Sequence, residues 1–422
     1  MKKFDCLVSA VICVMVLALW PQEARSYHRG KLHQIHAALA KRAPVEWIHY
    51  ENTDDWRWGE LAFNDEQYPL TIDVLENRHS RPDRVAFLVT PSGYNFRNNY
   101  FAPREKNIAH FLRENGYLVV SITFREDVMP EDNLDPSVRE WGIEKHVADM
   151  HKIVRILRRA VRLPYEFIGQ SSGAVCIMDY ASKFSHPWFE KIGLIDTDSF
   201  DPDIYPEKVA YSGITYDAIA QLMDEGILVD TFAADFKELI FAAALYPEMD
   251  SGQPRPEGLP GNFTLNGLLH FSLIYTAFLP GLTSPITGLP GEWVMIQGVC
   301  NGYYNFDIDP LQDDFGLTKT DHQVMPIVAA DIGQGTAPLA LAKDMYGLLA
   351  LSGDYTIDWC GIEERVVMVN GEFSSGDQSY YGTLIQNAGN SDVTLSIING
   401  YGYADLLWGT DAEAEVWPYL ID

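Results

Sequence analysis

The sequence predicts an α/β fold: a mostly parallel sheet flanked by helices, with a large inserted cap. Short apolar runs typical of buried strands alternate with segments of helical spacing, which is the pattern of a helix-covered parallel sheet. One run, Tyr165–Ile168, leads through Gly-Gln-Ser-Ser-Gly into an apolar segment that can continue as a helix. The alternation stops near residue 202 and returns near residue 359, so we expect the residues between them to form an insertion.

The first half of the chain supplies most of the predicted sheet. Val85–Thr90 is apolar throughout, as in strands that are buried on both faces. Ser137 and Glu140 stand at capping-box spacing, which predicts the start of a helix over 138–161. The other predicted strands are Val45–Tyr50, Glu60–Phe63, Leu70–Leu75, Tyr117–Phe124 and Ile192–Ile195, and the other predicted helices are Asn107–Asn115 and Ala174–Ala181.

The insertion is helical in places and is broken by connectors rich in proline and glycine at 247–261 and 280–291. After it the sequence predicts two strands and a short terminal helix, at Arg365–Gly371, Val393–Ile398 and Ala412–Trp417. The helices predicted within the insertion are Tyr216–Glu225, Phe232–Leu245 and Ala340–Leu351. The expected organisation is a signal peptide at 1–26, a core at 27–201, a cap at 202–358 and the rest of the core at 359–422.

The N-terminus has the three parts of a secretory signal. Lys2 and Lys3 form its basic start, Leu7–Trp20 its apolar stretch and Ala24–Ser26 its small-residue cleavage site. We therefore expect an exported protein, secreted or periplasmic, with no integral membrane segment after cleavage. The formal net charge of −28 argues against nucleic acid and anionic membrane surfaces as partners.

Cysteine usage gives a further expectation. Cys176, Cys300 and Cys360 remain after signal cleavage, and an oxidising compartment permits one disulfide, for which we expect Cys300 and Cys360. Cys176 is expected to be a buried thiol. The odd count and the lack of a C-x-x-C pair give no support to a metal or redox site, and no cofactor is expected.

The motif at 169–173 is where the sequence indicates chemistry. In a strand, G-x-S-x-G, helix context, the serine sits on a strained turn that exposes its hydroxyl, here Ser171. Gly169 and Gly173 are needed because a Cβ beside the turn would collide with the neighbouring strand or helix. The Ser172 amide, at the start of the helix, is expected to point toward a developing oxyanion. The alternative is a turn rich in glycine and serine that has no chemical role.

Three segments together resemble the α/β-hydrolase superfamily, in particular its esterases and lipases, over roughly 45–200 and 360–422. They are Pro-Ser-Gly-Tyr-Asn-Phe at 91–96, the motif at 169–173 and Gly-Tyr-Gly-Tyr-Ala-Asp-Leu-Leu-Trp-Gly-Thr-Asp-Ala at 400–412. The resemblance implies that Ser171 is the nucleophile and that amides of Ser172 and of the Gly93–Tyr94 loop form the oxyanion hole. It also implies an acid after the strand at 365–371, for which Asp377 is the candidate and Glu372 the alternative.

The sequence departs from this family at the general base. Tyr403 occupies the position of the usual histidine, and His322 is the last histidine of the chain. A neutral phenol with a pKa of about 10 does not accept a serine proton near neutral pH. Loss of the histidine from such a triad costs a factor on the order of 10⁶ in turnover.

A histidine elsewhere is the possible replacement. His322, preceded by Asp321, is the best candidate, and His270 and His186 also lie downstream of the motif. His146 and His151 belong to the helix before the motif and are expected to face solvent.

The sequence therefore predicts a secreted serine hydrolase-like protein that acts through Ser171 on carboxylic esters or related acyl substrates, with a rearranged or degenerate triad. Its ligand would be a small-molecule or lipid-like acyl compound. The competing hypothesis is a catalytically inactive binding protein that keeps the pocket. The sequence gives no indication of oligomeric state.

Overall fold

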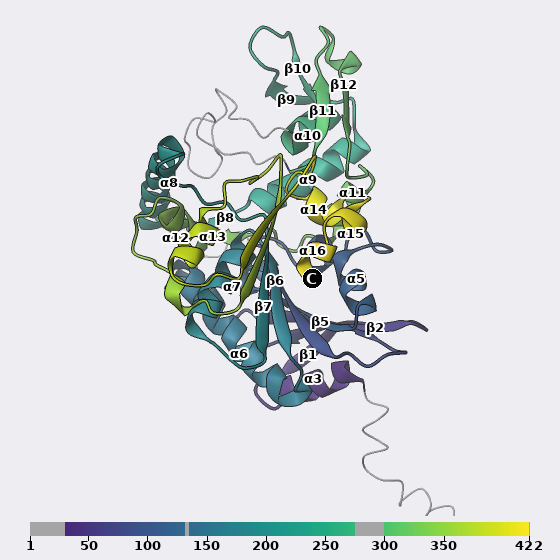
Figure 1. The fold of residues 1–422 in the computed structure, drawn as a ribbon. Helices are drawn as coiled ribbons and strands as arrows, with labels where there is room; N and C mark the ends of the chain where they lie inside the picture. The colour runs from purple at the N-terminus through teal and green to yellow at the C-terminus, as the bar shows by residue number, and fades with distance from the viewer. Residues whose placement is uncertain (1–29, 131–134, 275–298, 422) are drawn as a thin grey trace, which may run out of the picture.

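A computed structural model of the protein describes residues 30–130, 135–274 and 299–421 (Figure 1). Its centre is a nine-stranded sheet with the strand order β1-β2-β3-β5-β4-β6-β7-β14-β15. The strands are β1 (Val45–Asn52), β2 (Trp56–Phe63), β3 (Leu70–Asn77), β4 (Arg84–Val89), β5 (Tyr117–Thr123), β6 (Tyr165–Gln170), β7 (Phe189–Ile195), β14 (Arg365–Gly371) and β15 (Val393–Ile398). The predicted signal peptide lies outside the described residues.

The sheet is antiparallel at one edge and parallel elsewhere. β1, β2, β3 and β5 pair antiparallel in that order, whereas β5, β4, β6, β7, β14 and β15 are parallel neighbours. Parallel neighbours need crossover connections, which here contain helices. The carboxyl ends of β4, β6, β7 and β14 consequently meet at one edge, the upper end of the sheet in Figure 1. The predicted fold class is confirmed.

Both faces of the central strands are buried. In β4, Val85, Phe87 and Val89 belong to one hydrophobic core, and Ala86 and Leu88 belong to a second core on the opposite face. The first core includes residues of α3 (Lys31–Leu39), α6 (Ile143–Val161) and α7 (Ser172–Lys183). The second includes residues of α5 (Ile108–Glu114), α14 (Asp405–Trp408), α15 (Ala412–Glu415) and α16 (Pro418–Ile421). This is why the strand reads as a continuous apolar run.

The chain between β7 and β14 forms a second group of elements, which Figure 1 shows above the carboxyl ends of the central strands. Within it, α9 and α11 pack beside each other and α12 packs against α8. Its described elements are α8 (Pro206–Asp224), β8 (Val229–Asp230), α9 (Phe232–Leu245), β9 (Asp250–Pro254), β10 (Asn262–Thr264), α10 (Leu265–Ile274), β11 (Gly302–Asn305), η4 (Pro310–Gln312), β12 (Asp314–Leu317), α11 (Val324–Asp331), β13 (Ala337–Pro338), α12 (Leu339–Leu349) and η5 (Trp359–Gly361). The division at residues 202 and 358 stays a prediction.

The helix predicted over 138–161 begins later than expected. A short 3₁₀ helix, η2 (Pro136–Glu140), comes first, and its last turn closes when the Trp141 amide donates to the Val138 carbonyl. Gly142 then caps α6, which starts at Ile143, so Ser137 caps nothing. Gly142 separates η2 from α6, so the segment predicted as one helix forms two. The helix predicted at Tyr216–Glu225 is longer than expected, because α8 already begins at Pro206.

The expected disulfide between Cys300 and Cys360 is wrong. Both cysteines are free thiols, and so is Cys176. Cys300 is buried in the second core, whereas Cys360 is exposed in η5, which packs against α7 on the other side of the sheet. The two residues therefore lie in different layers of the fold.

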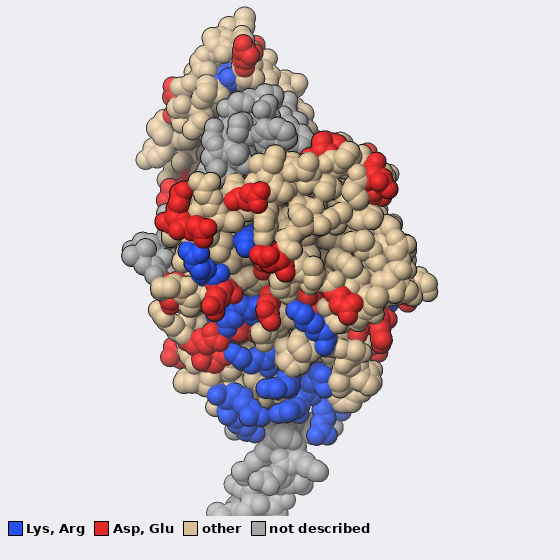
Figure 2. All heavy atoms as spheres, turned by 90° about the vertical axis from the view of Figure 1, so that its left-hand side faces the viewer, with Lys and Arg blue, Asp and Glu red and all other residues tan. Residues whose placement is uncertain are grey.

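The negative charge is unevenly distributed. Figure 2 shows Lys and Arg gathered at the lower end of one face, level with α3 and α6 in Figure 1, with Asp and Glu more frequent above them. In the described part of the chain, no helix combines the length and apolar character needed to cross a membrane.

Candidate active site

Ser171 lies on a sharp turn between β6 and α7. Its φ of 51° and ψ of −121° are conformations that L-residues rarely adopt, so the turn is strained. Two backbone hydrogen bonds hold this conformation. The Ser171 amide donates to the Ile195 carbonyl at 3.1 Å, and the Ser171 carbonyl accepts from the Val175 amide at 3.1 Å. Ser172 is the first residue of α7, and an amide at that position has no acceptor within its own helix.

The two glycines of the motif are required by contacts with backbone. A Cβ on Gly173 would lie 2.4 Å from the Val89 carbonyl oxygen and 2.9 Å from that of Thr90. A Cβ on Gly169 would lie 2.9 Å from the carbonyl carbon of Gly173. The tight approach of α7 to β4 and β6 that these contacts permit brings the Ser171 hydroxyl to the edge of the sheet.

The loop after β4 is fastened to this turn. The Ser92 amide donates to the Ser172 hydroxyl at 2.8 Å, and Gly93 has a φ of +80°, which a glycine adopts without strain. The Tyr94 amide already donates to the Pro91 carbonyl at 3.2 Å. The loop therefore lies beside the nucleophile position as expected, but its Tyr94 amide is engaged within the loop.

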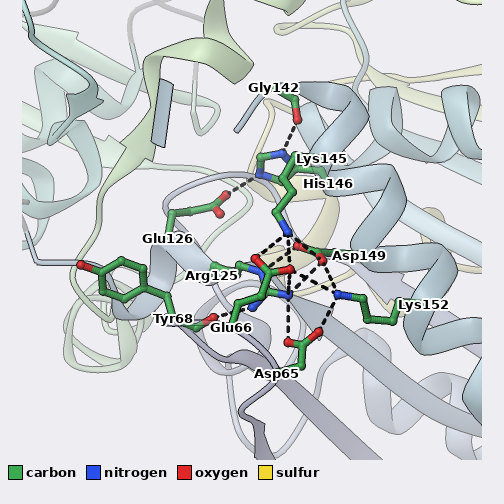
Figure 3. A network of polar contacts seen from close by, with 10 residues as sticks. All are labelled: Asp65, Glu66, Tyr68, Arg125, Glu126, Gly142, Lys145, His146, Asp149 and Lys152. Carbon is green, nitrogen blue, oxygen red and sulfur yellow. Dashed lines mark hydrogen bonds and ion pairs between the residues drawn. The ribbon is translucent and has the colours of Figure 1, made fainter. Parts of the chain in front are cut away.

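A chain of polar contacts supports the same loop from behind. The Ser92 hydroxyl donates to Glu126 at 3.1 Å, and the same Glu126 oxygen lies 3.1 Å from Nε2 of His146 (Figure 3). Nδ1 of His146 lies 2.7 Å from the Gly142 carbonyl oxygen. Burial lowers the pKa of His146, but Glu126 outweighs that effect and the pKa is raised. The expectation that His146 faces solvent is wrong, because a buried carboxylate partners it.

Beside this chain, Arg125 joins the end of β5 to α6 (Figure 3). Its guanidinium donates to both carboxylate oxygens of Asp149, at 2.8 and 2.9 Å, and to Asp65 at 3.0 Å. The side chains of Arg125 and Asp149 are only 2% and 3% exposed. Burial raises the pKa of Asp149, but Arg125 outweighs it and the pKa is lowered. The pair is a structural support rather than part of the site.

Ser171 opens into a cavity of about 640 Å³ beneath the elements inserted between β7 and β14. Ser92, Tyr94 and Ser172 also line it. Its walls are largely apolar, and they include nine aromatic residues: Tyr94, Phe200, Tyr211, Phe232, Phe236, Tyr346, Tyr381, Tyr403 and Trp408. The cavity is large enough to hold a small-molecule ligand beside the serine hydroxyl.

Tyr403 is brought to Ser171 by the loop that follows β15. Burial raises the pKa of Tyr403 well above the usual value, and the Ser171 side chain acts on the same phenol. The Gln170 side-chain amide donates to the Tyr403 carbonyl at 3.0 Å. Asp405 braces the loop by accepting from the Gly402 and Asn301 amides at 2.9 and 2.6 Å. The Tyr403 phenol is therefore neutral at physiological pH.

Asp196 is the carboxylate that sequence reasoning did not assign. It directly follows β7, is 1% exposed, and lines the same cavity as Ser171 and Tyr403. One oxygen accepts from the Ser374 hydroxyl at 2.7 Å and from the Gly371 and Ser375 amides at 3.3 Å. The other oxygen, Oδ2, is buried without a hydrogen-bond partner. Burial and the nearby charge of Asp198 raise the pKa of Asp196 to about 7. Its position at the end of a predicted strand was the available signal.

The other candidates from the sequence are not brought to Ser171. Asp377 is exposed and accepts from the Tyr205 hydroxyl at 3.3 Å, and Glu372 is exposed and accepts from the Gly400 amide at 2.8 Å. The His322 side chain is 71% exposed and lies 3.5 Å from Asp321. None of these residues lines the cavity.

The other histidines considered from the sequence as a base also lie elsewhere. His270 contacts the Asn266 carbonyl at 2.9 Å, His186 accepts from the Trp188 amide at 3.1 Å, and His151 stacks on Phe184. Over the described ranges, the cavity wall contains no histidine.

The chain matches no protein-family model, and no curated protein is significantly similar to it. Solved structures do resemble it. A putative lipase from Sulfolobus solfataricus superimposes with a TM-score of 0.56 at 16% identity, over 89% of this chain and 97% of that chain. A highly thermostable carboxyl esterase from Bacillus coagulans gives 0.44 at 14% identity, over 82% and 91%. A lipase in its open form gives 0.42 at 14% identity, over 90% and 97%.

At these identities the likeness to the three structures concerns the fold alone. The superposition with the first of them agrees with the mostly parallel sheet flanked by helices. The chain therefore has the α/β-hydrolase fold.

Proposed function

We propose that the protein hydrolyses carboxylic esters, or closely related acyl compounds, through Ser171. The observation that carries the proposal is the strained turn, which presents the Ser171 hydroxyl to a largely apolar cavity of about 640 Å³. In this mechanism the Ser171 oxygen attacks the ester carbonyl carbon. The Ser172 amide, at the start of α7, donates to the oxyanion that forms. The similar solved structure from Sulfolobus solfataricus is described as a putative lipase, which agrees with this reaction class.

The proton acceptor differs from the usual histidine. Tyr403 lies beside Ser171 but has a raised pKa, so it does not hold the serine proton by itself. We assign that role to Asp196, whose pKa of about 7 suits a general base near neutral pH. Tyr403 accepts the Ser171 proton as its own proton leaves toward Asp196, directly or across one water molecule. The proton returns to the departing alkoxide when the acyl-enzyme forms.

A second candidate function is ligand binding without turnover. The specific observation that favours it is the phenol beside Ser171 together with the lack of histidine among the described residues of the cavity wall. Such a protein would keep the cavity and bind an acyl compound that it does not cleave. In either case the N-terminal pattern supports an exported protein.

The test compares p-nitrophenyl ester turnover and fluorophosphonate labelling of the wild type with Ser171→Ala, Asp196→Asn and His322→Ala. We expect turnover and labelling in the wild type, neither in Ser171→Ala, strongly reduced turnover in Asp196→Asn, and wild-type rates in His322→Ala. Loss of turnover in His322→Ala would instead identify a histidine from the inserted elements as the base. Absence of both signals in the wild type would favour the binding protein.

A further inference from the structure

The cavity beside Ser171 has an unusual electrostatic character for an apolar pocket. Four carboxylates line it, Asp196, Asp198, Asp230 and Asp235, whereas its described lining contains no lysine, arginine or histidine. Their charges act on the same wall: Asp198 and Asp230 both raise the pKa of Tyr346, after burial, and Asp198 also acts on Asp196. The negative potential of a narrow, water-poor site favours a positively charged occupant and opposes an anionic one.

Several polar atoms of the cavity wall are buried without a hydrogen-bond partner. Oδ2 of Asp196, Oγ1 of Thr197 and Oε1 of Gln170 are all buried without a hydrogen-bond partner. The three residues are 1%, 2% and 1% exposed, and all three line the cavity. Two donors of the same lining, Nδ2 of Asn99 and Nε1 of Trp408, are also unpartnered, so the wall offers hydrogen bonds of both kinds. The charged atom among them, Oδ2 of Asp196, favours a ligand group that donates a hydrogen bond or carries positive charge.

Aromatic rings complete the surroundings that an organic cation prefers. The charge of Asp198 contributes to the raised pKa values of Tyr346 and Tyr381, and that of Asp196 contributes to the raised pKa of Tyr403. Phenol rings and carboxylates therefore lie close together in the wall. The faces of aromatic rings attract ammonium groups, most strongly where water is excluded. One ring already has a cation beside it: Lys208 lies 5.2 Å from the Phe200 centroid, but it bonds to Gln378 and does not line the cavity.

We propose that the ligand of this cavity is an organic cation, an acyl compound whose alkylammonium group lies among the cavity's carboxylates and phenol rings while its acyl group lies at Ser171. The inference rests on the proposed function for the position of the acyl group, and it adds the substrate class. The apolar aromatic wall selects an alkylated ammonium over a small, strongly hydrated cation. Fatty-acid carboxylates and phosphate esters are disfavoured ligands for the same electrostatic reason.

The test uses two esters of the same shape that differ in one charge. Butyrylcholine carries a trimethylammonium group, and 3,3-dimethylbutyl butyrate carries the neutral tert-butyl group in its place. Calorimetry with the full-length Ser171→Ala protein measures binding without cleavage. We expect the cationic ester to bind about tenfold more tightly than the neutral one. Equal affinity, or tighter binding of the neutral ester, would overturn the inference.

Variants locate the charge that is responsible. Asp230→Asn in the Ser171→Ala background should reduce the cationic preference several-fold, because Asp230 lines the cavity and is not part of the proposed reaction. Asp203→Asn is the matched control: it removes the same charge from an exposed carboxylate on the connector after β7, outside the cavity lining. An unchanged preference in Asp230→Asn, or an equal decrease in both variants, would contradict the assignment.

Turnover by the wild-type protein separates this inference from the proposed function. Selective binding of butyrylcholine without cleavage of either ester would contradict ester hydrolysis and leave the cation site intact. Cleavage of both esters with the same kcat/KM, together with equal binding, would support hydrolysis and contradict the cation site. A preference in kcat/KM that parallels the preference in binding is the result expected when both proposals hold.

Discussion

Tyr403 lies beside Ser171 at the carboxyl end of β6, although the two residues are far apart in the sequence. The Gln170 amide and the braced Asp405 turn hold the tyrosine there, so its position is built into the structure. This hydroxyl pair, with Asp196 in the same cavity, is the part of the protein on which the choice between catalysis and binding depends.

Tyr403→Phe removes the hydroxyl and keeps the ring. If Tyr403 passes the Ser171 proton on, we expect kcat/KM for p-nitrophenyl esters to fall by about 10²-fold, at the lower end of the contribution of a positioned proton-transfer group. Tyr403→His should raise it, because imidazole titrates near neutral pH. Tyr419→Phe, which alters an exposed tyrosine, is the control. Wild-type kcat/KM in Tyr403→Phe would exclude a role for the hydroxyl.

Asp196 predicts the pH dependence of the reaction. Its carboxylate form accepts the proton, so kcat/KM should rise with pH and level off above its pKa of about 7. Asp196→Asn should be slower by about 10²- to 10³-fold at pH 8 and should lose this inflection. Initial rates from pH 5 to 9 measure both effects. A wild-type profile without an inflection between pH 6 and 8 would argue against this assignment.

The same residue predicts a change in stability with pH. The pKa of Asp196 is raised from an ordinary value of 3.8 to about 7, so the folded protein binds its proton more tightly than the unfolded chain does. The stability that this provides is lost as pH rises from 3.8 to 7. Asp196→Asn should therefore gain Tm relative to the wild type at pH 8.5, and gain less at pH 5. Thermal unfolding at the two pH values measures the difference.

Gly173→Ala tests the close packing of the strained turn. The added Cβ would lie 2.4 Å from the Val89 carbonyl oxygen, so we expect a loss of about 1–3 kcal/mol in unfolding free energy together with loss of fluorophosphonate labelling. Gly213→Ala is the matched control within α8, where the nearest atom to a new Cβ lies 3.9 Å away. It should be neutral or stabilising by up to about 1 kcal/mol. Urea denaturation of both variants provides the comparison.

Asp149→Ala leaves the buried Arg125 guanidinium without its bidentate partner. Removal of one partner from a buried ion pair typically costs about 3–5 kcal/mol. Arg125 keeps its bonds to Asp65 and the Tyr68 carbonyl and its ion pair with Glu66, so we expect about 3 kcal/mol. The control is Asp55→Ala, since Asp55 and its partner His79 are 78% and 68% exposed. That variant should change stability by less than about 1 kcal/mol. Equal effects would show that burial does not strengthen the pair.

His146→Gln should cost more stability at low pH than at high pH. The pKa of His146 is raised by Glu126 despite burial, so its contribution is fully present below the ordinary histidine value and is lost as pH rises through the folded value. The charged or titratable groups acting on it include Glu126, Asp149 and Asp344. Chemical denaturation at pH 5.5 and 8.5 gives the two differences. A larger cost at pH 8.5 would mean that the neutral form is the stabilised one.

Local patterns in the sequence were sufficient for the fold class and for the turn at Ser171. The apolar run at 85–90 reflects a strand that is buried on both faces. Gly169 and Gly173 reflect the close backbone contacts around the turn at Ser171. Such constraints leave a direct trace in composition and spacing. The late start of α6 was missed because Ser137 and Glu140 fall within the 3₁₀ helix η2, and Gly142 caps α6 instead.

The arrangement of charged groups around the site could not be predicted in this way. Asp196 and Asp377 each follow a predicted strand in the sequence. Only the packing of the folded chain buries Asp196 in the cavity wall and leaves Asp377 exposed. His146 was expected in solvent because its partner Glu126 comes from a different segment. The sequence by itself determined where a nucleophile can stand, because a strained turn needs particular neighbours. Tertiary structure alone decided which carboxylates, phenols and histidines surround it, because burial and electrostatic pairing depend on residues that are distant along the chain.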